Sequence, residues 1–298
     1  MTAPLTDRIR SALSAPAAPA ARAFAARLGE HAGALGVLFY GSNLRTGSLD
    51  GVLDFYVLLP GAVEKGIWPR VSYQEWRHED RTLRAKVATM TLATFAAAAR
   101  GDLLDTTIWA RFVQPSALVW TRDEAAAAAV TAAVADAART AARFAVALGP
   151  EAGVAENFWR VLFRATYRAE FRIERAGREN DILDANREHF AGLLPVALDA
   201  EGIDCAREGE TLRPLMPKAR RDALRRAWRR RARWGKAYNL ARLVRASTTF
   251  EGAGRYAAWK IERHTGIPVA LTPWKERHPV LAAPGVLWRL WRTRRTAR

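Results

Sequence analysis

The sequence predicts an α+β fold with a mixed β-sheet first, a mainly helical part next and a basic helical region at the end. Short runs rich in β-branched and aromatic residues lie within the first 122 residues, and residues 123–148 form an alanine-rich run without Gly or Pro. We therefore expect a sheet domain over residues 1–122, a helical domain over 123–213 and a basic helical C-terminal region over 214–298.

Each element is expected from a local pattern. An N-terminal helix is expected to end near Leu28. Apolar, aromatic or β-branched runs predict strands at 36–40, 51–60, 71–76, 82–92 and 116–120, of which the first four are expected to share one mixed sheet. Alanine-rich runs and helical spacing of apolar residues predict helices at 91–112, with a break at Gly101-Asp102, and at 123–148, 156–177 and 220–247.

Composition limits the classes of partner. The net charge of +17 and the pI near 11.0 indicate an anionic partner: a nucleotide, an anionic membrane or nucleic acid. The single cysteine, Cys205, excludes an internal disulfide framework and a cysteine-rich zinc site, and the five histidines show no zinc-like spacing. Because no apolar run approaches the ~20 residues of a spanning helix, any membrane contact is expected to be peripheral.

The segment FYGSNLRTGSLDGVLDFYVLL, residues 39–59, carries the clearest chemical signal. It places a turn at Gly41-Ser42 between two strands, where free backbone N–H groups and a hydroxyl can hold phosphate oxygens. The second strand buries Asp54, whose charge a divalent metal would compensate, as in nucleotidyl transfer. Tyr56 stands where a generic nucleotidyltransferase has its second acid. The alternative is an ordinary loop followed by an aspartate paired with an arginine.

Residues 220–247 are the most basic part of the chain. Eight arginines lie within its first 14 residues: Arg220, Arg221, Arg225, Arg226, Arg229, Arg230, Arg231 and Arg233. One interpretation is a solvated basic face on a docked helix, and the other is a helix at the surface of an anionic bilayer. The tail 286–298 repeats the pairing of tryptophan with arginine. Nucleic acid would also accept such a surface, but no nucleic-acid-binding motif accompanies it.

Segments along most of the chain resemble, in the same order, motifs of the mitochondrial-type phosphatidate cytidylyltransferases, the translocator assembly and maintenance family, and the chain resembles its bacterial members. YGSNL at 40–44 resembles the family's Tyr-Gly-Ser-Gly/Ala-Val turn, with Asn43 in place of the small residue. VLDFYVLL at 52–59 resembles its Met/Leu-Asp-Phe strand, which also lacks the second acid. Further counterparts are LRAKVATMTL (83–92), IWARFVQP (108–115), ATYRAEFRIE (165–174), NREHF (186–190) and STTFEGAGRYAAWKIERHTG (247–266).

The resemblance implies a Mg²⁺-dependent transfer of CMP from CTP to phosphatidic acid, which yields CDP-diacylglycerol and pyrophosphate. It implies a cytoplasmic enzyme that is peripheral on the inner face of the inner membrane, or on the mitochondrial matrix side in a eukaryote; a homo-oligomer is possible. It implies catalytic roles for Asp54, Lys86 and Glu170, with Asp54 also the metal ligand. The nucleotide-binding residues are then Gly41, Ser42, Asn43 and Arg111, and Arg84 is an alternative to Lys86 for the basic residue.

Lipid-phosphate contacts are expected from Arg172, Lys260, Arg263 and His264. For the last three, a helix that simply packs through Tyr256, Trp259 and Ile261 is the alternative. Two other functions stay open: a nucleotidyltransferase that acts on RNA, a protein or a small molecule, and a non-catalytic basic protein that binds membranes or nucleic acid.

Overall fold

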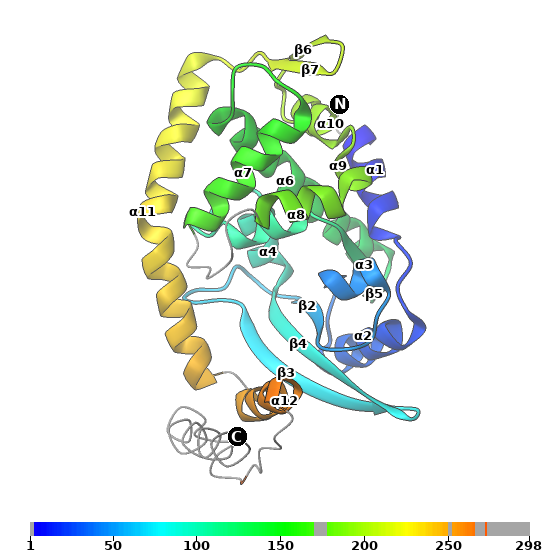
Figure 1. Cartoon of the computed structure of the whole chain (residues 1–298). Coiled ribbons are helices and arrows are strands. Elements are labelled where there is room, and N and C mark those ends of the chain that lie inside the picture. Colours follow the sequence, from blue (N-terminus) through cyan, green and yellow to red (C-terminus); the bar gives the residue numbers. More distant parts are fainter. Residues whose placement is uncertain (1–2, 170–177, 250–251, 266–271, 273–298) are drawn as a thin grey trace.

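The computed structural model describes residues 3–169, 178–249, 252–265 and 272, and its fold is α+β, as predicted (Figure 1). The strands are β1 Gly36–Tyr40, β2 Leu53–Leu59, β3 Arg70–His78, β4 Arg81–Thr91, β5 Ser116–Thr121, β6 Cys205–Glu208 and β7 Thr211–Pro214. The helices are α1 Ala3–Leu13, α2 Pro19–Ala32, α3 Ser42–Thr46, α4 Leu92–Ala99, α5 Thr107–Phe112, α6 Glu124–Leu148, α7 Ala155–Ala169, α8 Arg178–Ala185, α9 Arg187–Phe190, α10 Leu193–Ala200, α11 Lys218–Thr249 and α12 Ala253–Thr265.

The main sheet has five strands in the order β3-β4-β2-β1-β5. Strands β2 and β4 are parallel, and the other neighbours are antiparallel. All five expected strands are present, and β5 extends the four-stranded sheet that the sequence predicts. Because side chains alternate along a strand, Phe55 and Val57 of β2 face α2, whereas Asp54 and Tyr56 face the opposite side.

Helix α2 covers one face of the sheet through Phe24, whose ring lies 6.0 Å from that of Phe55 and 5.3 Å from that of Trp76. The prediction of one N-terminal helix ending near Leu28 is wrong, because α1 ends at Leu13 and α2 continues to Ala32. Pro19 occupies the first turn of α2, where its missing N–H costs nothing, but it could not continue α1.

The opposite face of the sheet packs against α4, α5 and α6 in one large hydrophobic cluster. Three rings mark its centre: Trp109 of α5 lies 5.4 Å from Phe144 of α6, and Trp228 of α11 lies 5.8 Å from Phe144. This cluster includes residues on both sides of the predicted boundaries at 122/123 and 213/214. The three predicted parts of the chain therefore contribute to one hydrophobic core. Their division into separate domains stays a prediction.

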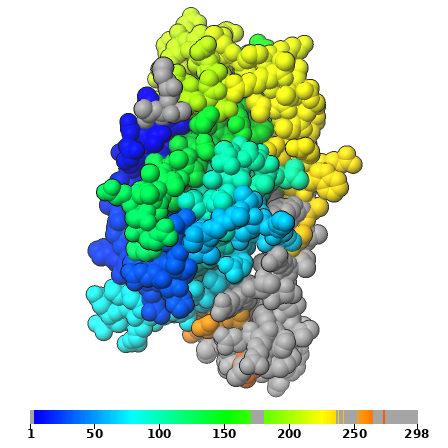
Figure 2. Space-filling view, turned by 180° about the vertical axis from the view of Figure 1, so that it is seen from behind, coloured from blue at the N-terminus to red at the C-terminus, as the bar shows by residue number. Residues whose placement is uncertain are grey.

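Helix α11 runs along one side of the molecule, shown in yellow from opposite directions in Figure 1 and Figure 2. Its inner side is docked by arginines: Arg220 pairs with Glu201 at 3.0 Å, and Arg225 donates to the carbonyl oxygen of Ala147 at 2.7 Å. Although α11 spans 32 residues, no helix in the described ranges is both long and apolar enough to cross a membrane.

Arg231 is a buried arginine of this helix. It donates to the carbonyl oxygens of Gly101 and, at 3.3 Å, Leu103, and its guanidinium lies 5.1 Å from the ring centre of Phe144. Burial, followed by the neighbouring Arg230 and Arg143, lowers the pKa of Arg231 to about 10, so the group is charged at neutral pH. Arg231 thus ties α11 to the break between α4 and α5.

We expect Arg231→Ala to lower the free energy of unfolding by about 3 kcal/mol, because buried carbonyl oxygens lose a charged donor. Arg229→Ala, on the exposed side of the same helix, is the matched control and should change it by no more than about 0.5 kcal/mol. Urea unfolding of both variants at pH 7 measures the difference. Equal stability of the two variants would contradict a docking role for Arg231.

Candidate active site

The strand register brings predicted site residues into one row across the sheet. Tyr40 of β1 is opposite Asp54 of β2, Asp54 is level with Lys86 of β4, and Lys86 is opposite Tyr73 of β3. Residues in register on neighbouring strands point to the same face of a sheet. Lys86, rather than Arg84, therefore stands beside Asp54, and both project from the face that α5 and α12 cover in part.

Gly41 brings its backbone against the Asp54 carboxylate. Its φ is +90°, a region that side chains disfavour, and an added Cβ would lie 3.3 Å from Asp54 Oδ2. The predicted tight turn is in fact the start of the five-residue helix α3, and Ser42 is its exposed first residue. The β1–β2 pairing thus brings Gly41 beside Asp54.

Asn43 braces the loop between α3 and β2. Its Nδ2 donates to the carbonyl oxygens of Ser48 and Asp50, both at 2.9 Å. These two bonds use both amide hydrogens, so any nucleotide contact of Asn43 would use its Oδ1 atom. Its nucleotide-binding role stays a prediction.

Arg111 reaches the same face from α5. Its Nη1 donates to the hydroxyl of Tyr56 at 3.0 Å, and its guanidinium lies 5.0 Å from the ring centre of Tyr40. Tyr56 stands at the position where a generic nucleotidyltransferase has its second acid, and its hydroxyl positions the Arg111 guanidinium. Sequence reasoning missed this role, although the two-residue spacing from Asp54 puts Tyr56 on the same face.

Asp54 is half-buried among these groups. Burial raises the pKa of its carboxyl above the usual value, and the positive charges of Lys86 and Arg111 act in the opposite direction. Burial is the largest of these effects, so the ionised carboxylate is held at a cost in stability. An added cation beside Asp54 would reduce that cost.

Helix α12 adds further basic side chains near the row of Tyr40, Asp54 and Lys86. An added Cβ on Gly51 would lie 3.0 Å from Nη1 of Arg263, which places this guanidinium against the loop that leads into β2. Arg263 and Arg84 also lie 5.3 and 5.5 Å from the ring centre of Trp259. Lys260 is exposed and lies 5.8 Å from the ring centre of Tyr256. Tyr256 packs against Tyr73 of β3, and Trp259 packs against Arg84 of β4. The side chains of Lys260 and Arg263 on the same helix are exposed.

Three predicted residues cannot be placed in the site. Glu170 and Arg172 lie outside the described residues, and so does the tail 286–298. His264 belongs to α12, but its side chain is outside the described part of the structure.

The carboxylate at Asp54 suits Mg²⁺ only if substrate phosphate oxygens complete the coordination of the ion. In the described ranges no three His, Cys, Asp or Glu side chains gather as a metal-binding group. Mg²⁺ is commonly held by one or two carboxylates together with substrate phosphate oxygens, and the half-buried Asp54 could supply one such oxygen ligand. The residues present therefore fit a metal that arrives with, or is completed by, a triphosphate.

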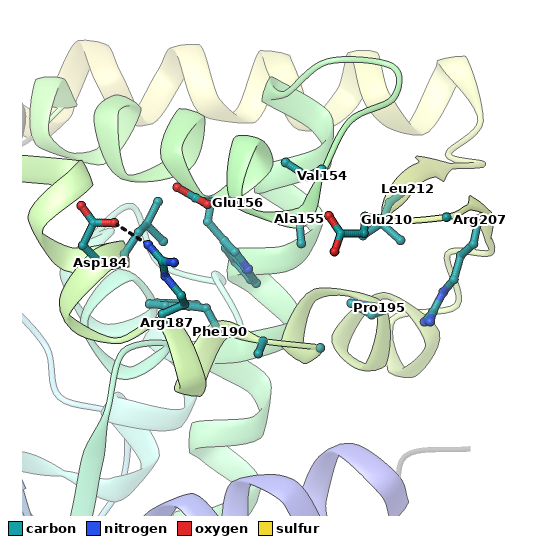
Figure 3. A pocket seen from close by; sticks show the side chains of 15 residues that line it. Val154, Ala155, Glu156, Asp184, Arg187, Phe190, Pro195, Arg207, Glu210 and Leu212 are labelled. Carbon is teal, nitrogen blue, oxygen red and sulfur yellow. Dashed lines mark hydrogen bonds and ion pairs between the residues drawn. The ribbon is translucent and has the colours of Figure 1, made fainter.

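A separate cavity of about 430 Å³ lies among α7, α9, α10 and the β6–β7 hairpin (Figure 3). Its lining includes Pro195, Phe190 and Leu212, and Arg187 on its edge pairs with Asp184 at 3.3 Å. Glu210 lies beside Leu212, and Arg207 lies at the end of the cavity opposite Arg187. This mixture of opposite charges around an apolar lining lacks the concentration of cations found around Asp54.

Comparison of the chain with models of protein families and with curated proteins finds no match. The fold and the geometry around Asp54 are therefore the observations on which a function can be argued.

We expect Asp54→Asn to raise the free energy of unfolding at pH 7, by up to about 2 kcal/mol, the usual range for one stabilising substitution. The folded-state pKa of Asp54 is raised, so the folded protein binds more protons than the unfolded chain between the two pKa values. Wild-type stability contributed by this group is lost as pH rises through that interval. The advantage of the variant should therefore disappear when pH falls below about 4, the unfolded pKa of aspartate.

Urea unfolding of both proteins at pH 7 and at the lowest pH where both are folded measures this difference. A variant that is less stable than the wild type at pH 7 would contradict the proposed cost of the buried charge.

Proposed function

We propose that this protein is a Mg²⁺-dependent nucleotidyltransferase that transfers CMP from CTP to phosphatidic acid and releases pyrophosphate. The observation that carries the proposal is the row of Tyr40, Asp54 and Lys86, with the backbone of Gly41 against the carboxylate and Arg111 over Tyr40. One acid close to two cations and to a glycine backbone suits a reaction between two anions. The choice of CTP and phosphatidic acid rests on the family resemblance of the sequence.

Each group has a role that follows from its position. The acceptor phosphate attacks the α-phosphorus of CTP, and the protein must align two anions and offset their charge. Lys86 and Arg111 would neutralise phosphate oxygens beside Asp54, and the backbone at Gly41 and Ser42 would hold the leaving pyrophosphate. Tyr56 fixes the orientation of Arg111 through its hydroxyl.

Asp54 would hold the magnesium ion, which, when bound, supplies positive charge to the phosphate oxygens. Glu170 is proposed as a supporting acid. The raised pKa of Asp54 supports this role, because a cation beside the carboxylate would stabilise its ionised form.

The acceptor phosphate is proposed to bind near Arg263. This guanidinium lies against the Gly51 backbone three residues before Asp54, and Arg84 shares its contact with Trp259. Lys260 adds a cation on the exposed side of the same helix.

The outer side of α11 supports a peripheral membrane contact. Among the α11 side chains that the structure describes, four arginines are exposed: Arg226, Arg229, Arg230 and Arg233. Trp234 is 54% exposed beside them. Each basic residue near an anionic bilayer contributes about 1 kcal/mol, and tryptophan suits the headgroup region.

We expect Asp54→Asn to lower kcat by about 100-fold or more, because the metal loses its charged ligand. Asp50→Asn removes the same charge from an exposed loop position four residues away, and it should keep nearly full activity. The assay follows radiolabelled CTP into CDP-diacylglycerol on vesicles that contain phosphatidic acid. Binding to these vesicles should be nearly the same for all three proteins.

Full activity of Asp54→Asn would rule out this metal site. Consumption of ATP or use of an RNA or protein acceptor, without CDP-diacylglycerol, would favour another nucleotidyltransferase. Vesicle binding without any nucleotide turnover would favour the non-catalytic alternative.

We expect Arg263→Gln to raise the KM for phosphatidic acid about tenfold, because the acceptor phosphate loses a charged partner worth about 1.4 kcal/mol. The KM for CTP should change less than twofold if the residue contacts only the acceptor. Arg81→Gln at the tip of the β3–β4 hairpin is the control for the loss of one exposed positive charge. An equal rise in both KM values would instead place Arg263 at the triphosphate.

A further inference from the structure

We propose that the pocket between α2 and the β3 edge of the sheet is a second phosphate-binding site, on the face of the sheet opposite Asp54. The pocket has a volume of about 670 Å³, within the range of about 300–1,000 Å³ that is usual for ligand sites. Arg27 and His31 of α2 line it on one side, and Arg70 of β3 lines it on the other.

The pocket exists because the sheet is wider than the helix that covers it. Helix α2 packs on β5, β1 and β2, and its Phe24 contacts Trp76 of β3. Between these contacts the β3–β4 margin is left uncovered. Strand alternation turns Arg70 and Ser72 toward this side, together with their register partners Thr89 and Val87. The floor therefore carries two hydroxyl groups beside apolar side chains.

The charge of the lining is strongly positive. Arg27, His31 and Arg70 are exposed, and among the described residues none of the three has an ion-pair partner. Arg255 of α12 also lines the pocket. Glu75 is the one carboxylate in the lining, and its Oε1 is occupied by the Tyr73 hydroxyl at 2.9 Å and by Arg84 at 3.2 Å.

These features fit a ligand with one or two phosphate groups and a small organic part. Arginine binds phosphate through charged, often paired hydrogen bonds, and hydroxyl groups donate to the same oxygens. A free diphosphate and the headgroup of a phospholipid share this chemistry. The inference does not rest on the proposed activity, because Asp54 and Lys86 project from the other face.

The test follows the imidazole signals of full-length protein with isotope-labelled histidine, with the His31 signal assigned from His31→Gln. Inorganic pyrophosphate without Mg²⁺ should shift this signal in a saturable way, also in an Asp54→Asn background. The double variant Arg27→Gln/Arg70→Gln should weaken this binding at least tenfold. Arg77→Gln is the matched control, because Arg77 lies on β3 but projects to the opposite face, and it should leave the affinity within twofold.

Vesicles of phosphatidylcholine with phosphatidic acid form the second arm. A saturable His31 shift with pyrophosphate identifies a free phosphate ligand, and a shift with these vesicles alone identifies a headgroup; either supports the site. The proposal is overturned if His31 responds to neither probe, or if the double variant binds as tightly as the Arg77→Gln control. If nucleotide transfer is absent but the His31 signal still responds to pyrophosphate, only the proposed function is contradicted.

Discussion

The register of β2 between β1 and β4 is the constraint on which the site depends. Leu53, Phe55 and Val57 must face α2 because they form the apolar cluster under that helix. A shift of one residue would move them out of this cluster and turn Asp54 into it, where its charge would have no partner. The hydrophobic pattern therefore holds Asp54 level with Lys86. Burial of one face of the strand determines the chemistry of the other.

Aromatic rings lie beside several of the arginines of this basic chain. Arg111 lies over Tyr40, Arg263 lies over Trp259, and the buried Arg231 lies over Phe144. A ring face attracts a guanidinium without neutralising it, so the positive charge stays available to an anionic ligand. This arrangement helps a chain with 47 Lys and Arg but 30 Asp and Glu residues to hold the cations that have no carboxylate partner. Arg231 additionally satisfies backbone carbonyl oxygens, as a purely apolar residue could not.

The two faces of the sheet offer different electrostatic environments. On the face with Asp54, cations surround a carboxylate and suit a metal with its triphosphate. On the α2 face, Arg27 and Arg70 lie beside hydroxyl groups, and the carboxylate in the lining, Glu75, is held by Tyr73 and Arg84. The outer strand β3 takes part in both, because its alternate side chains project to opposite sides. A substitution that changes the charge of a β3 residue therefore affects the face of the sheet to which that side chain projects.

The sequence by itself determined the α+β class, the five strands of the main sheet, the long helix α6 and the proximity of Gly41 to Asp54, because each follows from local periodicity or from the pairing of adjacent strands. It did not predict α8, α9, α10 or the β6–β7 hairpin, which are short elements that depend on packing. Only the tertiary structure decided that Tyr56 holds Arg111 and that α12 brings Arg263 to Gly51. These contacts join residues 55 and 212 positions apart, and no local pattern specifies which distant side chains will meet.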